Sequence, residues 1–191
     1  VLAGTESPGQ VVRIDSDGRT FVLLDSPYEE VRALRPQPDG SILAVAVSSD
    51  SLLTGTFATS GSASAPIATV SVTTSVTAVA GNSMSTNSTP TATSAGRSLR
   101  GAVYRIEADG LWDVLWRSDT DTPFDAVYQT DGSLVIGTGP DGKIFKVSDT
   151  PPRTLLLGRA PARHVTRFLK QPDGSLRYAT ANPGKLMTLP E

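Results

Sequence analysis

His164 is the only histidine in this sequence of 191 residues, which contains no cysteine. A histidine can act as a general base near neutral pH, but hydrolysis also needs a nucleophile. No Gly-x-Ser-x-Gly segment supplies an activated serine, and without cysteine the chain has no thiol nucleophile, disulfide or thiolate metal site. We therefore predict no catalytic residue. His164 is expected to be a loop residue that contacts a backbone carbonyl.

Two groups of acidic residues resemble cation ligands, one within residues 15–30 and the other within residues 119–125. The segment Asp15-Ser16-Asp17-Gly18 resembles the start of a calcium-binding loop, but the later ligands and the closing glutamate of such a loop are missing. Asp-Gly pairs recur along the chain, and turn geometry accounts for them more simply. We predict no metal site and no cofactor.

The elements that would position these residues come from an internal repeat. Four segments begin with glycine and then alternate apolar with polar or basic residues, at 9–14, 101–106, 142–147 and 184–189. The spacing between their glycines is 92, then 41, then 42. An Asp-Gly-Ser marker precedes each of the last two segments at one constant short spacing, whereas the marker at Asp39 lies far ahead of its own segment. One repeat is therefore predicted to contain an insertion of about 50 residues.

Each repeat is predicted to form four short strands, A to D in chain order. Strand C is the glycine-led segment. The other predicted strands are A at 32–35, 125–128 and 165–169, B at 2–5, 42–47, 134–137 and 176–180, and D at 20–24, 112–116 and 154–157. Asp-Gly pairs between strands predict hairpins of type I′, in which both central residues have positive φ. No helical periodicity of useful length occurs.

A period of about 41–42 residues with four strands is typical of a β-propeller blade. The chain resembles bacterial WD40-like and NHL/YVTN-type propeller repeats, whose blades carry Gly-Thr, a second glycine and alternating Val/Ile, Tyr/Phe and Arg/Lys. The matching segments are Gly4-Thr5 with 9–14, Gly137-Thr138 with 142–147 and, more weakly, Ala179-Thr180 with 184–189. No Trp-Asp pair ends strand C, and no Gly-His pair occurs, unlike in WD40 repeats. The resemblance covers residues 1–50 and 97–191, and it implies the fold alone.

Fourteen strands amount to about three and a half four-stranded antiparallel blades. Because closed propellers have about four to eight blades, we predict an all-β partial propeller. The chain is then either a segment of a longer propeller, or one of two copies whose 28 strands close a seven-bladed ring. Otherwise apolar blade faces and unpaired strand edges would lie in water.

Strand A lines the channel of a propeller, so its charged residues are candidate binding residues. One position of the three copies holds Ala33, Asp125 and Arg167, and Arg35 lies two residues beyond the first. A buried charge is costly unless it is paired. We predict either a polar channel site, in which Asp125 pairs with Arg167 of the adjacent blade, or a structural ion pair.

Trp112 is the candidate residue on the blade rim. It aligns with Thr20 and Arg153, which predicts a solvent-facing position on an outer strand, whereas Trp116 aligns with two leucines and is predicted to be core. Exposed tryptophan is enriched in binding hot spots. The alternative is that Trp112 covers the root of the insert.

Composition divides the chain and limits its partners. Residues 51–96 contain no Asp, Glu, Lys or Arg and 21 Ser or Thr. We expect propeller blades in residues 1–50, a Ser/Thr-rich uncharged insert within the second blade at 51–100, and further blades in 101–191. A net charge of −2 argues against nucleic acid, and no apolar run is long enough for a membrane span.

The insert carries two signals of its own. Residues 68–79 alternate partly with period two, which predicts an added strand or hairpin. Asn87-Ser88-Thr89 fits an N-glycosylation sequon, and O-glycosylation is an equal alternative. Both require an extracytoplasmic setting, which we expect to be periplasmic, secreted or at the cell surface.

These observations favour a non-catalytic binding or scaffold module. Its partner would be a protein or small molecule at the channel or blade rim, with a second copy or the rest of a longer chain completing the ring. One alternative is a segment of a lactonase-like or lyase-like propeller enzyme whose catalytic residues lie in other blades. Another is a structural repeat of a secreted or surface protein.

Overall fold

The computed structural model describes residues 1–48 and 100–189, which belong to one compact unit. In this part of the chain there are fourteen β-strands and no helix. The strands are β1 (Leu2–Gly4), β2 (Gln10–Ile14), β3 (Thr20–Asp25), β4 (Glu30–Pro36), β5 (Ile42–Val47), β6 (Gly101–Ile106), β7 (Trp112–Ser118), β8 (Thr122–Tyr128), β9 (Leu134–Gly139), β10 (Lys143–Asp149), β11 (Pro152–Arg159), β12 (His164–Lys170), β13 (Leu176–Ala181) and β14 (Lys185–Leu189).

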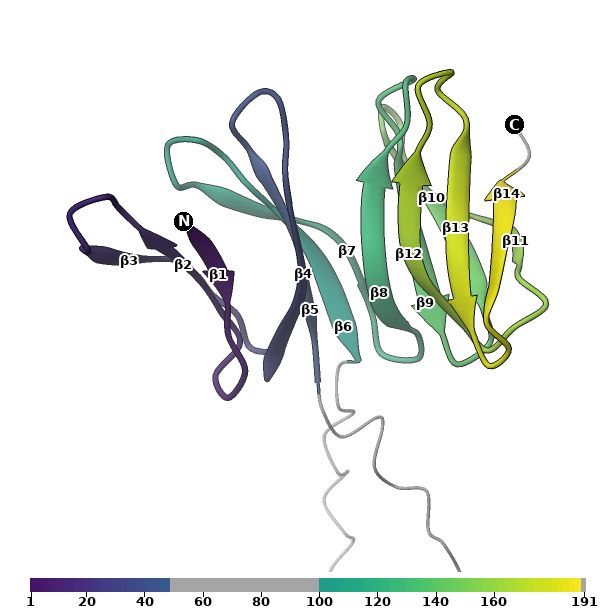
Figure 1. Cartoon of the computed structure of the whole chain (residues 1–191), viewed down its shortest axis with the longest axis horizontal. Helices are drawn as coiled ribbons and strands as arrows, with labels where there is room; N and C mark the ends of the chain where they lie inside the picture. Colours follow the sequence, from purple (N-terminus) through teal and green to yellow (C-terminus); the bar gives the residue numbers. More distant parts are fainter. Residues whose placement is uncertain (49–99, 190–191) are drawn as a thin grey trace, which may run out of the picture. The chain divides into compact units, whose positions relative to one another are not determined.

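The strands pair in chain order into four antiparallel sheets (Figure 1). The first sheet is β1 to β3, the second β4 to β7, the third β8 to β11 and the fourth β12 to β14. Consecutive sheets pack together, since β1 contacts β4, β5 and β6 contact β8, and β9 contacts β12. The inner strands β4, β8 and β12 also contact one another in turn. This arrangement of successive blades confirms the predicted all-β partial propeller.

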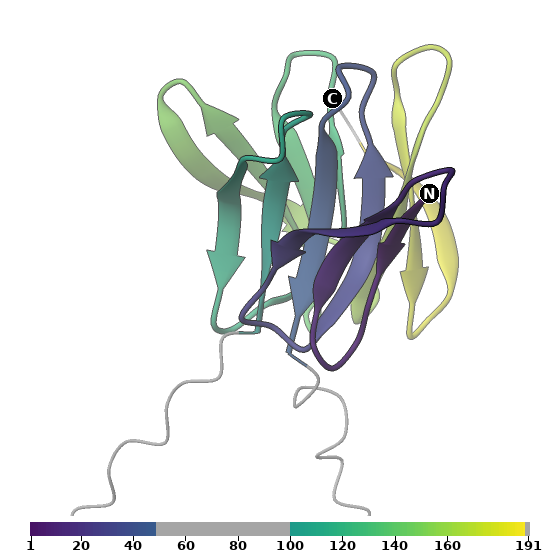
Figure 2. The ribbon, with the colours of Figure 1, turned by 90° about the vertical axis from the view of Figure 1, so that its left-hand side faces the viewer.

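The two three-stranded sheets lack different strands. The first begins with β1, the equivalent of strand B, whereas the fourth ends with β14, the equivalent of strand C. Figure 2 presents the first sheet in front of the others. Because both sheets contain a complete B–C pair, they cannot merge into one blade. Two copies would therefore bring together eight sheets rather than the seven blades that 28 strands suggested.

Three apolar clusters hold the sheets together, one at each junction. Alternate residues of β5 serve two of them, because successive side chains of a strand point to opposite faces. Ala44 and Ala46 belong to the first cluster, and Leu43 and Val45 to the second. A central strand covered on both faces is apolar throughout, as β5 is.

The Asp-Gly turns between strands are present, but they are not of type I′. In the turn after β4, Gly40 has a φ of 83°, whereas Asp39 has a negative φ. The Gly40 amide donates to the Gln37 carbonyl at 3.1 Å, which is a type I turn followed by a left-handed glycine. The Asp39 carboxylate accepts the Ser41 amide at 3.0 Å. This side-chain bond stabilises the turn with a single residue at positive φ.

Several sequence predictions lie outside the described residues. They concern the insert at 51–100 apart from Arg100, the strand expected at 68–79, and the sequon at Asn87. The described chain leaves β5 at Val47 and enters β6 at Gly101, and these two residues face each other in the ladder. The described residues include no helix with the length and apolar character that crossing a membrane requires.

Candidate functional site

Each inner strand contains a β-bulge close to its start. The register shifts immediately before Ala33 in β4, Asp125 in β8 and Arg167 in β12, which is the position that the repeat alignment singled out. A bulge bends its strand and redirects the side chains that follow it. The bulges therefore decide where the candidate channel residues point.

Asp125 is fully buried, and its carboxylate is held by two residues. Arg35 Nε donates to Oδ1 at 2.7 Å, and Arg35 Nη2 donates to Oδ2. The Phe168 amide donates to Oδ2 at 2.6 Å, and Arg35 Nη2 also donates to the Phe168 carbonyl at 2.7 Å. This bidentate ion pair, which we call the inner clamp, joins β4, β8 and β12. It satisfies the buried charge and ties three sheets together.

Arg167 lies at the edge of the inner clamp. Its Nε atom is 4.0 Å from Asp125 Oδ2, and its side chain is 54% exposed, against 21% for Arg35. The predicted Asp125–Arg167 pair is therefore present only as a long contact, and Arg35 is the main partner. The Arg35 and Phe168 donors already occupy the carboxylate, which leaves Arg167 facing solvent.

His164 begins β12 within an aromatic and cationic cluster. Its ring centroid is 5.1 Å from that of Phe124, and the Arg32 guanidinium lies 4.8 Å from the same ring. Arg32 is in turn paired with Glu30 at 2.7 Å. Burial, with the charges of Arg163 and Arg32, lowers the pKa of His164 below its ordinary 6.5. These contacts replace the backbone-carbonyl contact expected from the sequence, and they make His164 a neutral stacking residue near pH 7.

The acidic groups of the sequence pair with basic side chains. Asp15 binds Arg13 at 2.9 Å, and the nearly buried Asp121 binds Lys143 at 2.7 Å. Within residues 1–48 and 100–189, no three His, Asp or Glu side chains converge in a way that could hold a metal ion.

Trp112 is 48% exposed at the start of β7, in agreement with the expected solvent-facing position. Its ring lies 5.7 Å from that of Tyr104, edge to face. Trp112 pairs with Ile106, whereas Gly101, where the chain returns from the insert, pairs with Ser118 at the other end of β7. Trp112 therefore does not cover the root of the insert. Trp116, 8% exposed, is a core residue as predicted.

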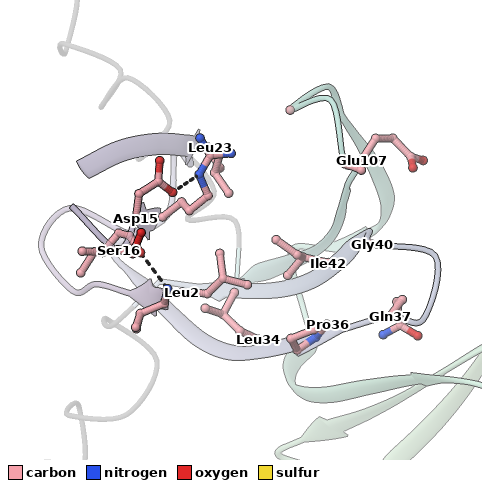
Figure 3. A pocket seen from close by; sticks show the side chains of 15 residues that line it. Leu2, Asp15, Ser16, Leu23, Leu34, Pro36, Gln37, Gly40, Ile42 and Glu107 are labelled. Carbon is pink, nitrogen blue, oxygen red and sulfur yellow. Dashed lines mark hydrogen bonds and ion pairs between the residues drawn. The ribbon is translucent and has the colours of Figure 1, made fainter. Parts of the chain in front are cut away.

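A hollow of about 770 Å³ opens at the junction of the first and second sheets (Figure 3). We call it the junction pocket. Leu2, Leu23, Leu34 and Ile42 give it an apolar lining from four strands. Its polar lining residues are Arg13, Asp15, Ser16, Gln37 and Glu107. Ligand pockets typically have volumes of about 300–1,000 Å³ and combine apolar walls with a few polar groups, as here.

Two differences from the second junction account for the space: the first sheet has no strand A, and β4 ends in Pro36. Pro36 pairs with Ile42 at the end of β4, and Tyr128 pairs with Leu134 at the end of β8, so the two occupy equivalent positions. Tyr128 packs into the apolar cluster of the second junction. With a proline at this position, the first junction lacks the aromatic ring. Sequence reasoning missed the pocket, although the aligned repeats already showed a proline in place of a tyrosine.

Comparison with known proteins shows a likeness of fold alone. No family model matches the sequence, and neither does any curated protein sequence. A solved structure of a protein provisionally named a gluconolactonase is 12% identical, with a TM-score of 0.48. The alignment covers 96% of this chain and 60% of that protein, so the chain spans about three fifths of its length. The class that the sheets themselves define is the partial β-propeller.

Proposed function

We propose that this chain is a non-catalytic propeller module that binds a ligand in the junction pocket. The observation that carries the proposal is the pocket itself, with its four aliphatic side chains and its charged rim. We also propose that the repeats are of the bacterial WD40-like and NHL/YVTN type, which is a statement about the fold and not about the ligand.

The channel residues take a structural role in this proposal. Asp125 and Arg35 satisfy each other and the backbone of Phe168, so neither is available to a ligand without breaking the inner clamp. Trp112 is assigned to the rim, as a contact for a protein partner. The proposed setting is extracytoplasmic, on the strength of the sequence.

Charge supports a second copy as the protein partner, joined head to tail through the open faces of the first and fourth sheets. Counted over both faces and the turns of each sheet, residues 2–25 contain four acidic and two basic side chains, whereas residues 164–189 contain four basic and one acidic. Opposite charges favour this pairing and oppose the association of like ends. Native mass spectrometry of the full chain should detect a dimer that dissociates with added salt. A monomer at every concentration would overturn the dimer.

Methyl NMR tests the pocket directly. The full chain, labelled with ¹³C at Leu and Ile methyl groups, is mixed with a library of small fragments. Fragments that bind should move the signals of Leu34 and Ile42 while leaving those of Leu43 and Leu134, in the filled second junction, unchanged. A library that moves no signal of the pocket would refute the proposed function.

A further inference from the structure

The first and second junctions are built from equivalent residues. Leu2 of β1 pairs with Arg13 of β2, and Leu43 of β5 pairs with Arg105 of β6, at the same place in two successive sheets. Each junction therefore presents a leucine and an arginine to the inner strand of the following sheet. The second junction can thus serve as a template for the first.

The two junctions differ in two respects. The second includes Ala33 of β4, whereas the first sheet has no equivalent strand. They also differ in the residue at the end of the inner strand that closes them. Tyr128 lies against the second cluster, and burial, the larger effect, raises the pKa of its phenol. The charge of the Arg105 guanidinium lowers the same pKa, and the buried Tyr128 hydroxyl has no hydrogen-bond partner of its own among the described residues. At the second junction, this position is therefore filled by a phenol ring in an apolar setting, with a guanidinium nearby. At the first junction Pro36 leaves the place open.

Arg13 has fewer carboxylate partners than its counterpart, although its guanidinium also lies 4.9 Å from the Phe21 ring. Arg105 binds two carboxylates, with Nη2 3.0 Å from Asp39 and Nε 2.9 Å from Glu107. Arg13 binds Asp15 through Nε at 2.9 Å, and the described residues give it no second carboxylate. The Arg13 side chain is 44% exposed, against 31% for Arg105. It therefore retains donors for an oxygen that enters the pocket.

We propose that the junction pocket binds the phenol ring of a ligand, in the place that Tyr128 takes at the next junction, with Arg13 donating to the ring oxygen. This inference rests on the proposed function and names its ligand class. The volume of about 770 Å³ exceeds that of one ring, so the ligand can carry a further group. A small phenol and a tyrosine side chain of a peptide share this chemistry.

The first test uses 4-methylphenol, with toluene as the matched probe that lacks the hydroxyl. In the full chain, 4-methylphenol should shift the methyl signals of Leu34 and Ile42 and bind about tenfold more tightly than toluene, because it adds a hydrogen bond to a charged donor. Arg13→Leu should abolish that preference while toluene binding persists. N-acetyltyrosinamide distinguishes the two sources: binding as tight as that of 4-methylphenol supports a peptide, and weaker binding supports a small phenol.

Substitutions that fill the pocket form the second test. Pro36→Tyr should weaken 4-methylphenol binding at least about tenfold, since the new ring takes the same space. Leu34→Phe, at the position where the fourth sheet carries Phe168, provides a second filling variant. Lys170→Tyr, equivalent to Pro36 in the fourth sheet, is the matched control and should leave binding unchanged.

Tyr128→Ala gives the converse result. Removing this ring should create a second site, so that the signals of Leu43 and Leu134 now move with 4-methylphenol, because an apolar cavity left by truncation can accept the missing ring.

Each negative outcome has one meaning. If other fragments move the pocket signals and 4-methylphenol does not, the phenol class is refuted and the proposed function stands. If no fragment moves them, the proposed function itself is refuted. If Pro36→Tyr and Leu34→Phe both fold and still bind 4-methylphenol as tightly as the parent chain, the ring does not bind in the junction pocket.

Discussion

The second and fourth sheets are copies of the same repeat, but they have different surroundings. In strand B, Leu43 of the second sheet is 1% exposed, between Arg35 and Arg105 in the ladder. The equivalent residue of the fourth sheet is the exposed Arg177, between Leu169 and Thr188. The repeat pattern sets where the strands are, whereas the neighbouring sheet sets which side chains a face can carry.

The turns between strands A and B show the same contrast. Asp131 in the third sheet binds Lys146 at 2.7 Å, and Asp39 in the second binds Arg105 at 3.0 Å. In the fourth sheet, Asp173 keeps its bonds to Ser175, while the strand C position of Lys146 is taken by Thr188. The fourth sheet retains the local turn chemistry and lacks the cross-strand ion pair.

The largest effect is expected from exchanging the contrasting residues of strand B. Leu43→Arg should cost at least about 4 kcal/mol of unfolding free energy, because it places an unpaired charge in a closed junction. In the monomeric chain, at concentrations below those at which the proposed dimer forms, Arg177→Leu should change stability by less than about 0.5 kcal/mol, because that face is then open. Urea unfolding measures both values. Equal costs at the two positions would show that the fourth sheet is covered in solution.

Asp125→Ala should have the next largest effect, about 3–5 kcal/mol, since it leaves the Arg35 guanidinium partly buried without its carboxylate. Arg167→Ala is the control, and it should cost less than about 0.5 kcal/mol because this arginine is a long, exposed contact. A double-mutant cycle on Arg35 and Asp125 reports the coupling. A coupling near zero would refute the inner clamp.

Trp112→Ala should cost about 1 kcal/mol, the scale of one edge-to-face aromatic contact with Tyr104. Trp116→Ala, in the core of the same strand, should cost about 3 kcal/mol. Thermal unfolding of the two variants compares them. If Trp112→Ala is as damaging as Trp116→Ala, the rim position is not open to solvent.

The smallest effect is a difference in pH dependence between the turns. The Lys146 hydrogen bond, followed by the Ser133 bonds, lowers the pKa of Asp131, and the Ser175 bonds lower that of Asp173, both from 3.8. A carboxylate with a lowered folded pKa stabilises the fold above its unfolded pKa and loses this contribution as pH falls through the folded value. Stability should therefore fall below about pH 4, and Asp131→Asn should reduce the fall more than Asp173→Asn. Unfolding at a series of pH values gives both slopes, and equal slopes would contradict the contrast.

The sequence predicted the strands well because two markers fix the phase of every repeat. The glycine before strand C and the Asp-Gly before strand B place β5 and β6 to the residue. It could not identify Arg35 as the partner of Asp125, because that contact depends on a bulge and on three sheets at once. The aligned repeats show Pro36 where the third sheet has Tyr128. They do not show the empty space that results, because that space depends on how the sheets pack.

The ladder between β5 and β6 has a consequence for the integrity of the chain. These central strands pair at six positions, from Ile42 with Ile106 to Val47 with Gly101, and the Ser48 amide continues the ladder by donating to the Arg100 carbonyl at 3.1 Å. Closing about 50 residues instead of a short hairpin costs about 2 kcal/mol, so this pair should form late in folding. A protease cut between Ser48 and Arg100 would leave all fourteen described strands paired. The two fragments should remain associated under native conditions and separate on denaturation. The protein should therefore also assemble from two separately produced fragments.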